Sequence, residues 1–147
     1  MTESLRYSYD VSLRITHPAH VPEFFSSSLG RDPRYSWTVG QPRVTRKGAP
    51  LPGIYKETYC SYSFDVPEDD DLPRFLDETL TDLAQHKGLF DKIQESGGKA
   101  GFFIGLFTGA FNTGFVLSAD LQRRSAALGL SLDFDIYGYG GSSDDAA

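Results

Sequence analysis

A strict alternation of apolar and polar side chains over residues 5–16 constrains the fold of this chain more than any other stretch. One set of alternate positions is apolar, namely Leu5, Tyr7, Tyr9, Val11, Leu13 and Ile15. The positions between them, from Arg6 to Thr16, are polar or charged. Successive side chains of a β-strand point to opposite faces of the sheet, so the pattern predicts a strand with one face in the core and the other in water.

Two later stretches repeat this alternation and predict further strands of the same kind. Residues 54–66 would direct Thr58, Cys60, Tyr62, Phe64 and Val66 to the core, and residues 130–136 would direct Leu130, Leu132, Phe134 and Ile136 there. A short strand is also expected over residues 35–39. The loop that follows it, residues 40–53, is rich in glycine and proline and is expected to have no regular structure.

Apolar residues at helical spacing predict helices between these strands. The first is expected over residues 18–29, ending at Gly30, with a buried side formed by Val21, Phe24, Phe25 and Leu29. The second begins near Asp71 and continues, with a break at Gly88, to Ile93. A last helix is expected over residues 120–128.

Residues 100–119 form a stretch of 20 residues without a charge, which is long enough to cross a bilayer. Polar residues interrupt it, however, and the sequence "FNTG" is typical of a turn. We therefore expect a buried β-hairpin, with strands over residues 102–107 and 114–117, in preference to a membrane helix.

The predicted order of elements is βαββαβ followed by βαβ. The first six elements match the ferredoxin-like order, an α+β fold with an antiparallel sheet and helices on one face, and the last three form a C-terminal βαβ extension. A chain of 147 residues suits one domain. We place this domain at residues 1–138 and expect residues 139–147 to form a flexible polar tail.

Composition excludes several classes of function. The net charge of −6 argues against nucleic acid or an anionic membrane as a partner. Cys60 is the only cysteine, which excludes an internal disulfide and a cysteine-rich zinc site, and its place on a core face suggests packing. No phosphate-binding or dinucleotide-binding motif occurs, so no cofactor is expected. The N-terminus has no apolar stretch after a basic start, which favours the cytoplasm.

Two pairs of residues could carry chemistry. Asp133 and Asp135 would lie on one strand face about 6.5–7 Å apart, a separation compatible with glycoside hydrolysis. A catalytic pair needs two different environments, whereas alternation places both carboxylates on the solvent side with Tyr137, so we favour a solvated or partner-facing surface. His17 and His20 could bind a metal, but a surface turn is favoured because only one acidic side chain lies nearby.

Charge is distributed unevenly along the sequence. Residues 31–47 contain five basic residues and one acid, although the chain as a whole is acidic. A basic loop close to an aromatic residue is a plausible recognition element, and the alternative is that these arginines only balance the acidic surface. We therefore predict partner-binding residues at Trp37, Arg43, Arg46 and Lys47, together with Asp133, Asp135 and Tyr137. Residues 65–71 contain five acids but lack the spacing of a calcium loop, and are expected to place negative charge at a helix N-terminus.

Two segments resemble a known family. The sequence "LSADLQRRSAALGLSLDFDIYG" (117–138) is similar to the closing helix and strand of the bacterial family called domain of unknown function 4279. The sequence "FFSSSLGRDPRYSWTVGQP" (24–42) resembles the early helix of that family and the segment after it, with Gln41 in place of the expected acidic residue. The resemblance implies an α+β domain and brings no known activity with it.

Three hypotheses for the function follow. The leading one is a non-catalytic protein-binding module, for example an immunity-type protein that neutralises a bacterial toxin. The second is a small-ligand-binding or sensor domain that uses the apolar hairpin over residues 102–115 as one wall of a pocket. The third is a hydrolase that uses Asp133 and Asp135, or His17 and His20. The sequence indicates neither the identity of the partner nor an oligomeric state.

Overall fold

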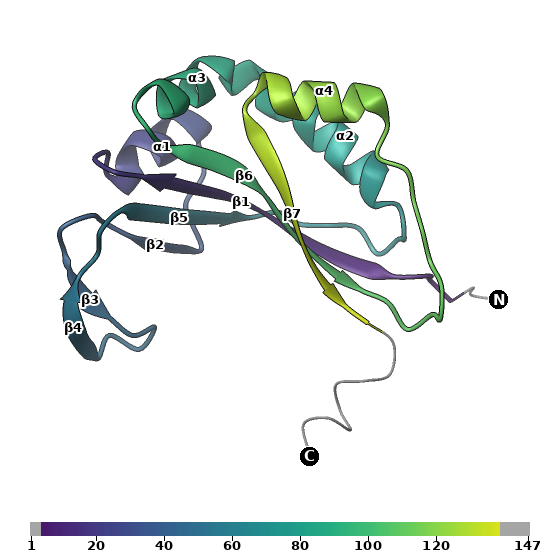
Figure 1. Cartoon of the computed structure of the whole chain (residues 1–147), viewed down its shortest axis with the longest axis horizontal. Coiled ribbons are helices and arrows are strands. Elements are labelled where there is room, and N and C mark those ends of the chain that lie inside the picture. Colours follow the sequence, from purple (N-terminus) through teal and green to yellow (C-terminus); the bar gives the residue numbers. More distant parts are fainter. Residues whose placement is uncertain (1–3, 139–147) are drawn as a thin grey trace.

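The structure, a computed structural model, describes residues 4–138 and is a mixed α+β fold, as predicted (Figure 1). The elements in chain order are β1 (Ser8–His17), α1 (Pro22–Leu29), β2 (Tyr35–Trp37), β3 (Pro42–Val44), β4 (Pro50–Ile54), β5 (Thr58–Ser63), α2 (Leu72–Leu83), the 3-10 turn η1 (Ala84–His86), α3 (Lys87–Glu95), β6 (Lys99–Phe107), α4 (Ala119–Ala127) and β7 (Leu130–Tyr137). Residues 139–147, where a flexible tail is expected, lie outside the described residues.

The main sheet has five strands in the order β2-β5-β1-β6-β7. All neighbouring pairs are antiparallel except β6 and β7, which are parallel. β1, the most strictly alternating segment, is the central strand, and its Leu13 and Ile15 are fully buried. The helices cover one face of the sheet and leave the other face open (Figure 1).

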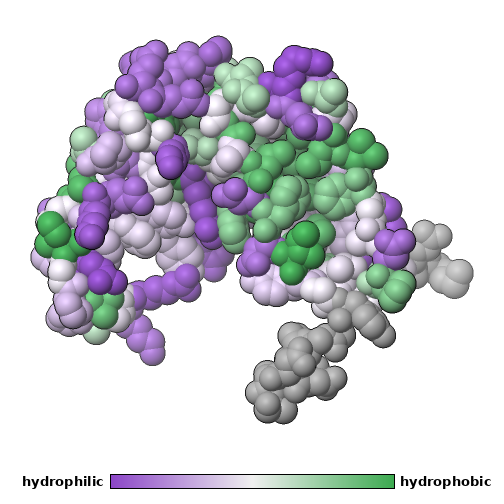
Figure 2. Space-filling model, viewed as in Figure 1, coloured by the Kyte–Doolittle hydropathy of each residue, from purple (hydrophilic) through white to green (hydrophobic). Residues whose placement is uncertain are grey.

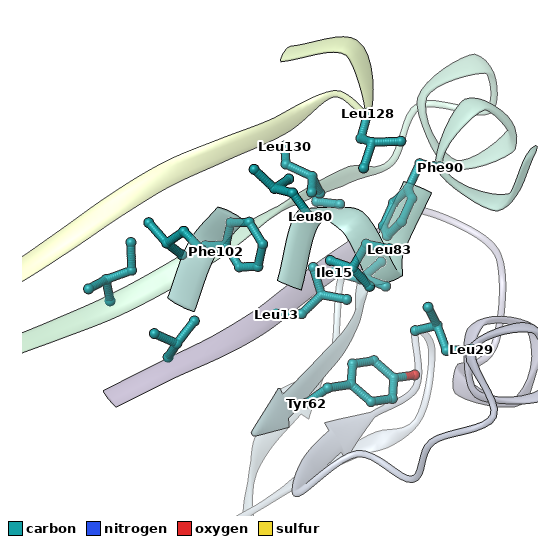
Figure 3. Close-up of a cluster of buried hydrophobic side chains, with 14 of the residues drawn as sticks. Leu13, Ile15, Leu29, Tyr62, Leu80, Leu83, Phe90, Phe102, Leu128 and Leu130 are labelled. Atoms are coloured by element: carbon teal, nitrogen blue, oxygen red, sulfur yellow. The ribbon is translucent and has the colours of Figure 1, made fainter. Parts of the chain in front are cut away.

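The core lies between the sheet and this helical layer (Figure 3). α2 presents its apolar side to the sheet because Leu72, Leu76 and Leu80 recur at helical spacing, and all three are buried. The helix begins where predicted, since the side chain of Asp71 accepts a hydrogen bond from the backbone N–H of Arg74 at 3.2 Å. Each buried leucine contributes about 1.5–3 kcal/mol to folding.

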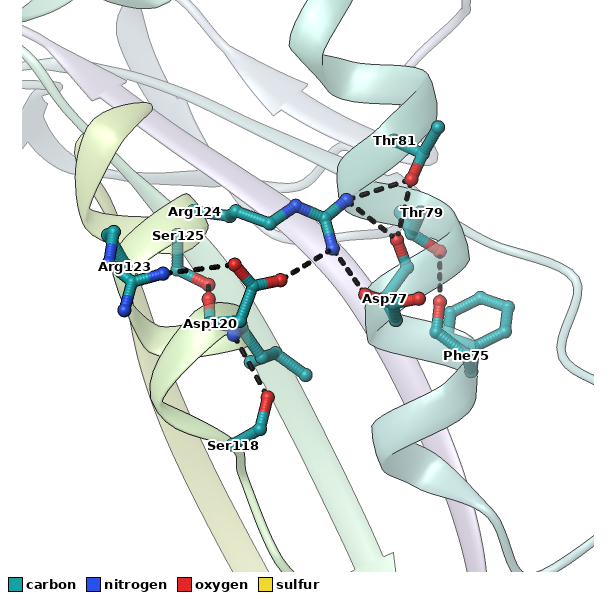
Figure 4. A network of polar contacts seen from close by, with 10 residues as sticks. Phe75, Asp77, Thr79, Thr81, Ser118, Asp120, Arg123, Arg124 and Ser125 are labelled. Carbon is teal, nitrogen blue, oxygen red and sulfur yellow. Dashed lines mark hydrogen bonds and ion pairs between the residues drawn. The ribbon is translucent and has the colours of Figure 1, made fainter.

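An ion-paired contact joins α2 and α4. Arg124 of α4 binds the carboxylate of Asp77 and, at 2.8 Å, the hydroxyl of Thr81, both on α2 (Figure 4). The carboxylate of Asp120 lies 3.8 Å from the same guanidinium. All the charged groups in this network therefore have partners of opposite sign.

The first helix is shorter than predicted. α1 starts at Pro22, so Val21 precedes the helix and its side chain is 44% exposed, although the helical spacing predicts it to be buried. Proline suits the first turn of a helix because the N–H that it lacks would have no partner there. Phe25 and Leu29 are buried as expected, and Gly30 ends the helix in the left-handed conformation with φ 67°.

The predicted hairpin over residues 102–107 and 114–117 is wrong. Residues 102–107 belong to β6, but residues 114–117 form no strand, because β1 and β7 already occupy both edges of β6. The C-terminal part is therefore one helix and one strand and lacks the first strand of the predicted βαβ. Phe115 instead packs its ring 5.5 Å from that of Tyr7. Within residues 4–138, no helix is both long and apolar enough to cross a membrane.

The prediction of an irregular loop over residues 40–53 is also wrong. β3 and β4 pair to form a separate two-stranded sheet, here called the β3–β4 arm (residues 42–54), which projects from the main sheet (Figure 1). Its turn is closed by a hydrogen bond of 2.9 Å from the N–H of Gly48 to the carbonyl of Thr45. Gly48 has φ 87°, a conformation that favours glycine. The prolines are tolerated because each strand of the arm has a free edge.

Two further residues depart from their predicted positions. Leu5 precedes β1 and is 49% exposed, although the alternation assigns it to the core. Alternation assigns Ile136 to the core, but its side chain is 61% exposed near the end of β7. Phe134, two residues earlier, is half-buried and packs against the core as predicted. Burial therefore decreases toward the C-terminal end of this strand.

Candidate binding groove on the open face of the sheet

The open face of the sheet carries most of the residues that could bind a partner. Directly paired residues of neighbouring strands point to the same face. Trp37 pairs with Tyr59, and Arg14 pairs with Ser61. By this register the open face consists of Tyr35 and Trp37 of β2, Tyr59, Ser61 and Ser63 of β5, Asp10, Ser12 and Arg14 of β1, Gly101, Phe103, Gly105 and Phe107 of β6, and Ser131, Asp133, Asp135 and Tyr137 of β7.

A half-open groove of about 900 Å³ runs over this face, between the sheet and the β3–β4 arm. Figure 2 shows the hollow beside the arm. The sheet supplies the floor, including Ser12, Arg14 and Phe103, and the arm supplies a wall that includes Val44 and Arg46. The groove thus depends on the position of the arm, which lies against the open face of the sheet.

Stacked aromatic rings hold the arm in this position. The indole of Trp37 stacks with the ring of Tyr59, at 4.4 Å between centroids, and with the ring of Tyr55, at 5.0 Å. The hydroxyl of Tyr55 accepts a hydrogen bond from the N–H of Val44 and donates one to its carbonyl, both at 3.1 Å. Each stacked pair contributes about 0.5–1.5 kcal/mol beyond its buried area. Because Trp37 and Tyr59 belong to the main sheet and Tyr55 directly follows β4, this stack supports the arm.

Arg14 lies at the centre of the groove floor. Its guanidinium carbon is 3.5 Å from the centroid of the Phe103 ring. Its Nε is buried and has no hydrogen-bond partner within residues 4–138. Stacking on an aromatic ring uses the face of a guanidinium and leaves its N–H groups, which lie in the plane, free to donate. An unsatisfied buried donor costs about 1–3 kcal/mol, and this cost falls on the Nε of Arg14.

Two more arginines in the groove are held in the same way. The guanidinium carbons of Arg34 and Arg46 lie 5.4 and 4.4 Å from the ring centroid of Tyr35. In the part of the chain that the structure describes, neither these two arginines nor Arg14 forms an ion pair. Ion pairs are formed by Arg6, Arg74, Arg123 and Arg124. The floor and arm side of the groove therefore gather three arginines without ion-pair partners in a protein whose net charge is −6.

The opposite end of the groove is acidic. Asp10 and Asp135 line it there, together with Tyr137. The hydroxyl of Tyr137 donates a hydrogen bond of 2.7 Å to the carboxylate of Asp135, which raises the pKa of Tyr137. The ring of Tyr137 stacks on that of Phe107 at 5.0 Å. The groove is thus basic beside the arm and acidic beside β7.

The structure brings together four of the seven residues predicted to bind a partner. The four that line the groove are Trp37, Arg46, Asp135 and Tyr137. Asp133 lies on the same face but is exposed and outside the groove lining. Arg43 donates a hydrogen bond of 3.2 Å to the carbonyl of Pro52 within the arm. Lys47 is exposed in the turn of the arm.

Sequence reasoning missed Arg14, Arg34, Tyr55 and Phe103. The sequence gives one local signal for Arg14: it is a long, charged side chain in a strand whose other central polar side chains are short. Its contact with Phe103 depends on the pairing of β1 with β6, which follows from the tertiary fold.

The prediction that His17 lies in a surface turn is wrong, since the residue is only 1% exposed. Its Nδ1 accepts hydrogen bonds from the N–H groups of Ala19 and His20, at 2.9 and 2.8 Å. Its Nε2 donates to the hydroxyl of Ser96 at 2.7 Å, because that hydroxyl itself donates to the carbonyl of Lys92. Burial, with a smaller effect of His20, lowers the pKa of His17. Both ring nitrogens are therefore occupied in the fold.

Other candidate groups also have structural roles. Burial raises the pKa of the Cys60 thiol to about 11, so it is not a thiolate at neutral pH. In the acidic segment 65–71, Asp69 accepts a hydrogen bond of 2.7 Å from the hydroxyl of Tyr9, and Asp70 pairs with Arg6 at 3.0 Å. Among residues 4–138, no cluster of three or more histidine, cysteine or acidic side chains could hold a metal ion.

Comparison with known proteins gives one match. The model of the family described as "Domain of unknown function (DUF4279)" matches residues 6–139. No match was found among curated proteins or among solved structures.

Proposed function

We propose that this chain, which belongs to the domain of unknown function (DUF4279) family, is a non-catalytic protein-binding module that docks a partner protein in the groove beside the β3–β4 arm. Neutralisation of a toxin by an immunity-type protein is one activity that such docking would provide. The single observation that carries the proposal is a rigidly supported groove containing three arginines without ion-pair partners in residues 4–138.

The dimensions of the groove support a segment of polypeptide as its occupant. It crosses all five strands from β2 to β7, a width of about 19 Å at a strand spacing of roughly 4.8 Å. An extended segment of about six residues would span this width at roughly 3.3 Å per residue. The arm also exposes apolar side chains, with Val44 44% and Ile54 57% exposed. Apolar residues beside arginine and aromatic residues are the composition that protein interfaces favour.

The test compares two charge reversals of equal size. One variant combines Arg34→Glu with Arg46→Glu, which lie in the groove, and the control combines Arg43→Glu with Lys47→Glu, which lie outside its lining. Wild-type protein and both variants are used for affinity capture from the native host, and retained proteins are identified by mass spectrometry. The best candidate is then produced pure, and its Kd is measured by calorimetry.

We expect the groove variant to lose the partner and the control variant to keep it. Circular dichroism of both variants should match the wild type, because all four side chains are exposed. If both variants lose the partner equally, the effect comes from the change in net charge. If both keep the partner equally, docking takes place on another surface. Either result contradicts the proposal.

A small-ligand-binding role is the second candidate, because a volume of about 900 Å³ falls within the usual range for ligand pockets. The apolar hairpin expected to form a pocket wall is absent from residues 4–138, so a ligand would occupy the same groove. Native mass spectrometry of protein purified from the host distinguishes the two roles. A bound compound of low mass that is lost in the groove variant would favour the second.

We also propose that β1, α1, β2, β5, α2 and β6 correspond to the ferredoxin-like order, with β7 added beside β6. The strand order β2-β5-β1-β6 supports this correspondence. Superposition of an experimental structure on ferredoxin-like domains would test it.

A further inference from the structure

We propose that the groove recognises an acidic, extended segment of its partner, and that one aspartate or glutamate side chain of this segment binds Arg14. This inference rests on the proposed docking function and specifies its chemistry. It depends on the free donors of Arg14, the room above it and the charges at the two ends of the groove.

The donors of Arg14 are arranged for a carboxylate. A guanidinium presents N–H groups in one plane, and a carboxylate accepts two of them in parallel hydrogen bonds. Stacking on Phe103 at 3.5 Å keeps the guanidinium flat against the ring and leaves this edge free. The Nε is buried and without an acceptor in residues 4–138, so the terminal N–H groups are the donors that a carboxylate in the groove can reach.

Neighbouring residues keep space open above this site. Gly105, two residues from Phe103 on the same face of β6, lines the groove and has no side chain to fill it, whereas the side chain of Ser131 occupies the space over Gly101. Ser61, the small partner of Arg14 on β5, also lines the groove. The guanidinium of Arg14 therefore borders the groove volume, where a short acidic side chain can reach it.

The remaining charges favour an acidic peptide over a nucleic acid. Arg34 and Arg46 extend the positive charge toward the arm, where further acidic residues of the segment would lie. Asp10 and Asp135 at the other end would repel a strand that carries a phosphate at every residue. The segment should therefore place its acids beside the arm and neutral or basic residues beside β7.

The experiment uses a phage-displayed library of random 12-residue peptides selected on immobilised wild-type protein. Selected peptides are synthesised with a fluorescein label, and their Kd values are measured by fluorescence anisotropy. The protein variants are Arg14→Gln and Arg14→Lys, with Arg123→Gln as the matched control on the exposed surface of α4. Each peptide is also made with its acidic residues changed to the corresponding amides.

We expect the selected peptides to be enriched in aspartate and glutamate. Arg14→Gln should weaken binding roughly ten- to hundredfold, the range expected for hydrogen bonds to a charged group. Arg14→Lys should cause an intermediate loss because it keeps the charge without the planar donors, and Arg123→Gln should change nothing. On the wild-type protein, the amide form of the peptide should bind more weakly than the acidic form by about the same factor. On Arg14→Gln, the acidic and amide forms should have nearly equal Kd values.

Several results would overturn the inference. These are selection of peptides without an excess of acids, no binding peptide at all, or equal affinity of Arg14→Gln and the wild type for an acidic peptide. If Arg14→Gln fails to fold, the comparison of acidic and amide peptides on the wild type still decides the question. Neutral peptides that compete with the captured partner would refute the acidic chemistry and leave the docking function standing. Capture unaffected by the groove variant would refute the docking function itself.

Discussion

Replacing Gly98 with alanine tests how tightly the start of β6 packs against the buried His17. A Cβ at position 98 would lie 2.6 Å from Cδ2 of His17, 2.8 Å from Cγ2 of Ile93 and 2.9 Å from the carbonyl oxygen of Thr16. The backbone cannot easily move away, because the N–H of Gly98 donates a hydrogen bond of 2.7 Å to the carbonyl of Ile93. The change therefore forces a buried ring, a buried methyl group and a backbone oxygen apart.

The magnitude follows from two opposing effects. Adding a methyl group to a packed site costs about 1–3 kcal/mol, and three contacts below 3.0 Å place Gly98→Ala near the upper end. Alanine also lowers the conformational entropy of the unfolded chain, which offsets about 0.4–1 kcal/mol of this cost. We expect a net loss of about 2 kcal/mol in the free energy of unfolding, or a fall in Tm of roughly 4–8 °C for a chain of this size.

Urea denaturation followed by circular dichroism measures the effect. Gly88→Ala is the matched control, since Gly88 lies in α3 and a Cβ added there would meet nothing within 4 Å. This control should gain about 0.4–1 kcal/mol in stability. The two glycine-to-alanine changes should thus have opposite signs. A Gly98→Ala protein as stable as the wild type would refute the packing described around His17.

Three further predictions concern titration, the arm and the aspartate pair. Because the pKa of His17 is lowered in the folded protein, its neutral form stabilises the fold fully above about pH 6.5, and this contribution should be lost as pH falls through the folded-state pKa. When the pH is lowered from 8 to 5, the free energy of unfolding should therefore fall less in His17→Asn than in the wild type. Tyr55→Phe removes both hydrogen bonds to Val44, so amide exchange in the arm should accelerate while global stability changes by less than about 1 kcal/mol; unchanged exchange would contradict the supporting role of Tyr55. Asp133→Asn with Asp135→Asn should change stability by about 0.5 kcal/mol or less per residue in urea melts, and a loss of several kcal/mol would contradict their placement on the open face.

Local patterns were sufficient to predict the elements whose structure depends on near neighbours in the chain. The alternation in residues 5–16 predicted the central strand and, from Tyr7 onward, its buried face, because a strand directs successive side chains to opposite sides. The helical spacing of apolar residues after Asp71 predicted the start of α2, because this spacing depends only on residues within a few turns of one another. The solvent side of Asp133 and Asp135 followed from the same two-residue period.

Only the tertiary structure decided which strands pair and what their open face brings together. Residues 114–117 are not a strand because β7 occupies the edge of β6 that a hairpin would need. Periodicity within residues 114–117 cannot show that β7 pairs there instead. The groove depends on contacts between residues distant in sequence, such as Arg14 on Phe103 and Trp37 on Tyr59. Such contacts follow from strand order and register, which are determined by the packing of the whole core, whereas periodicity reports only which side of its own strand a residue takes.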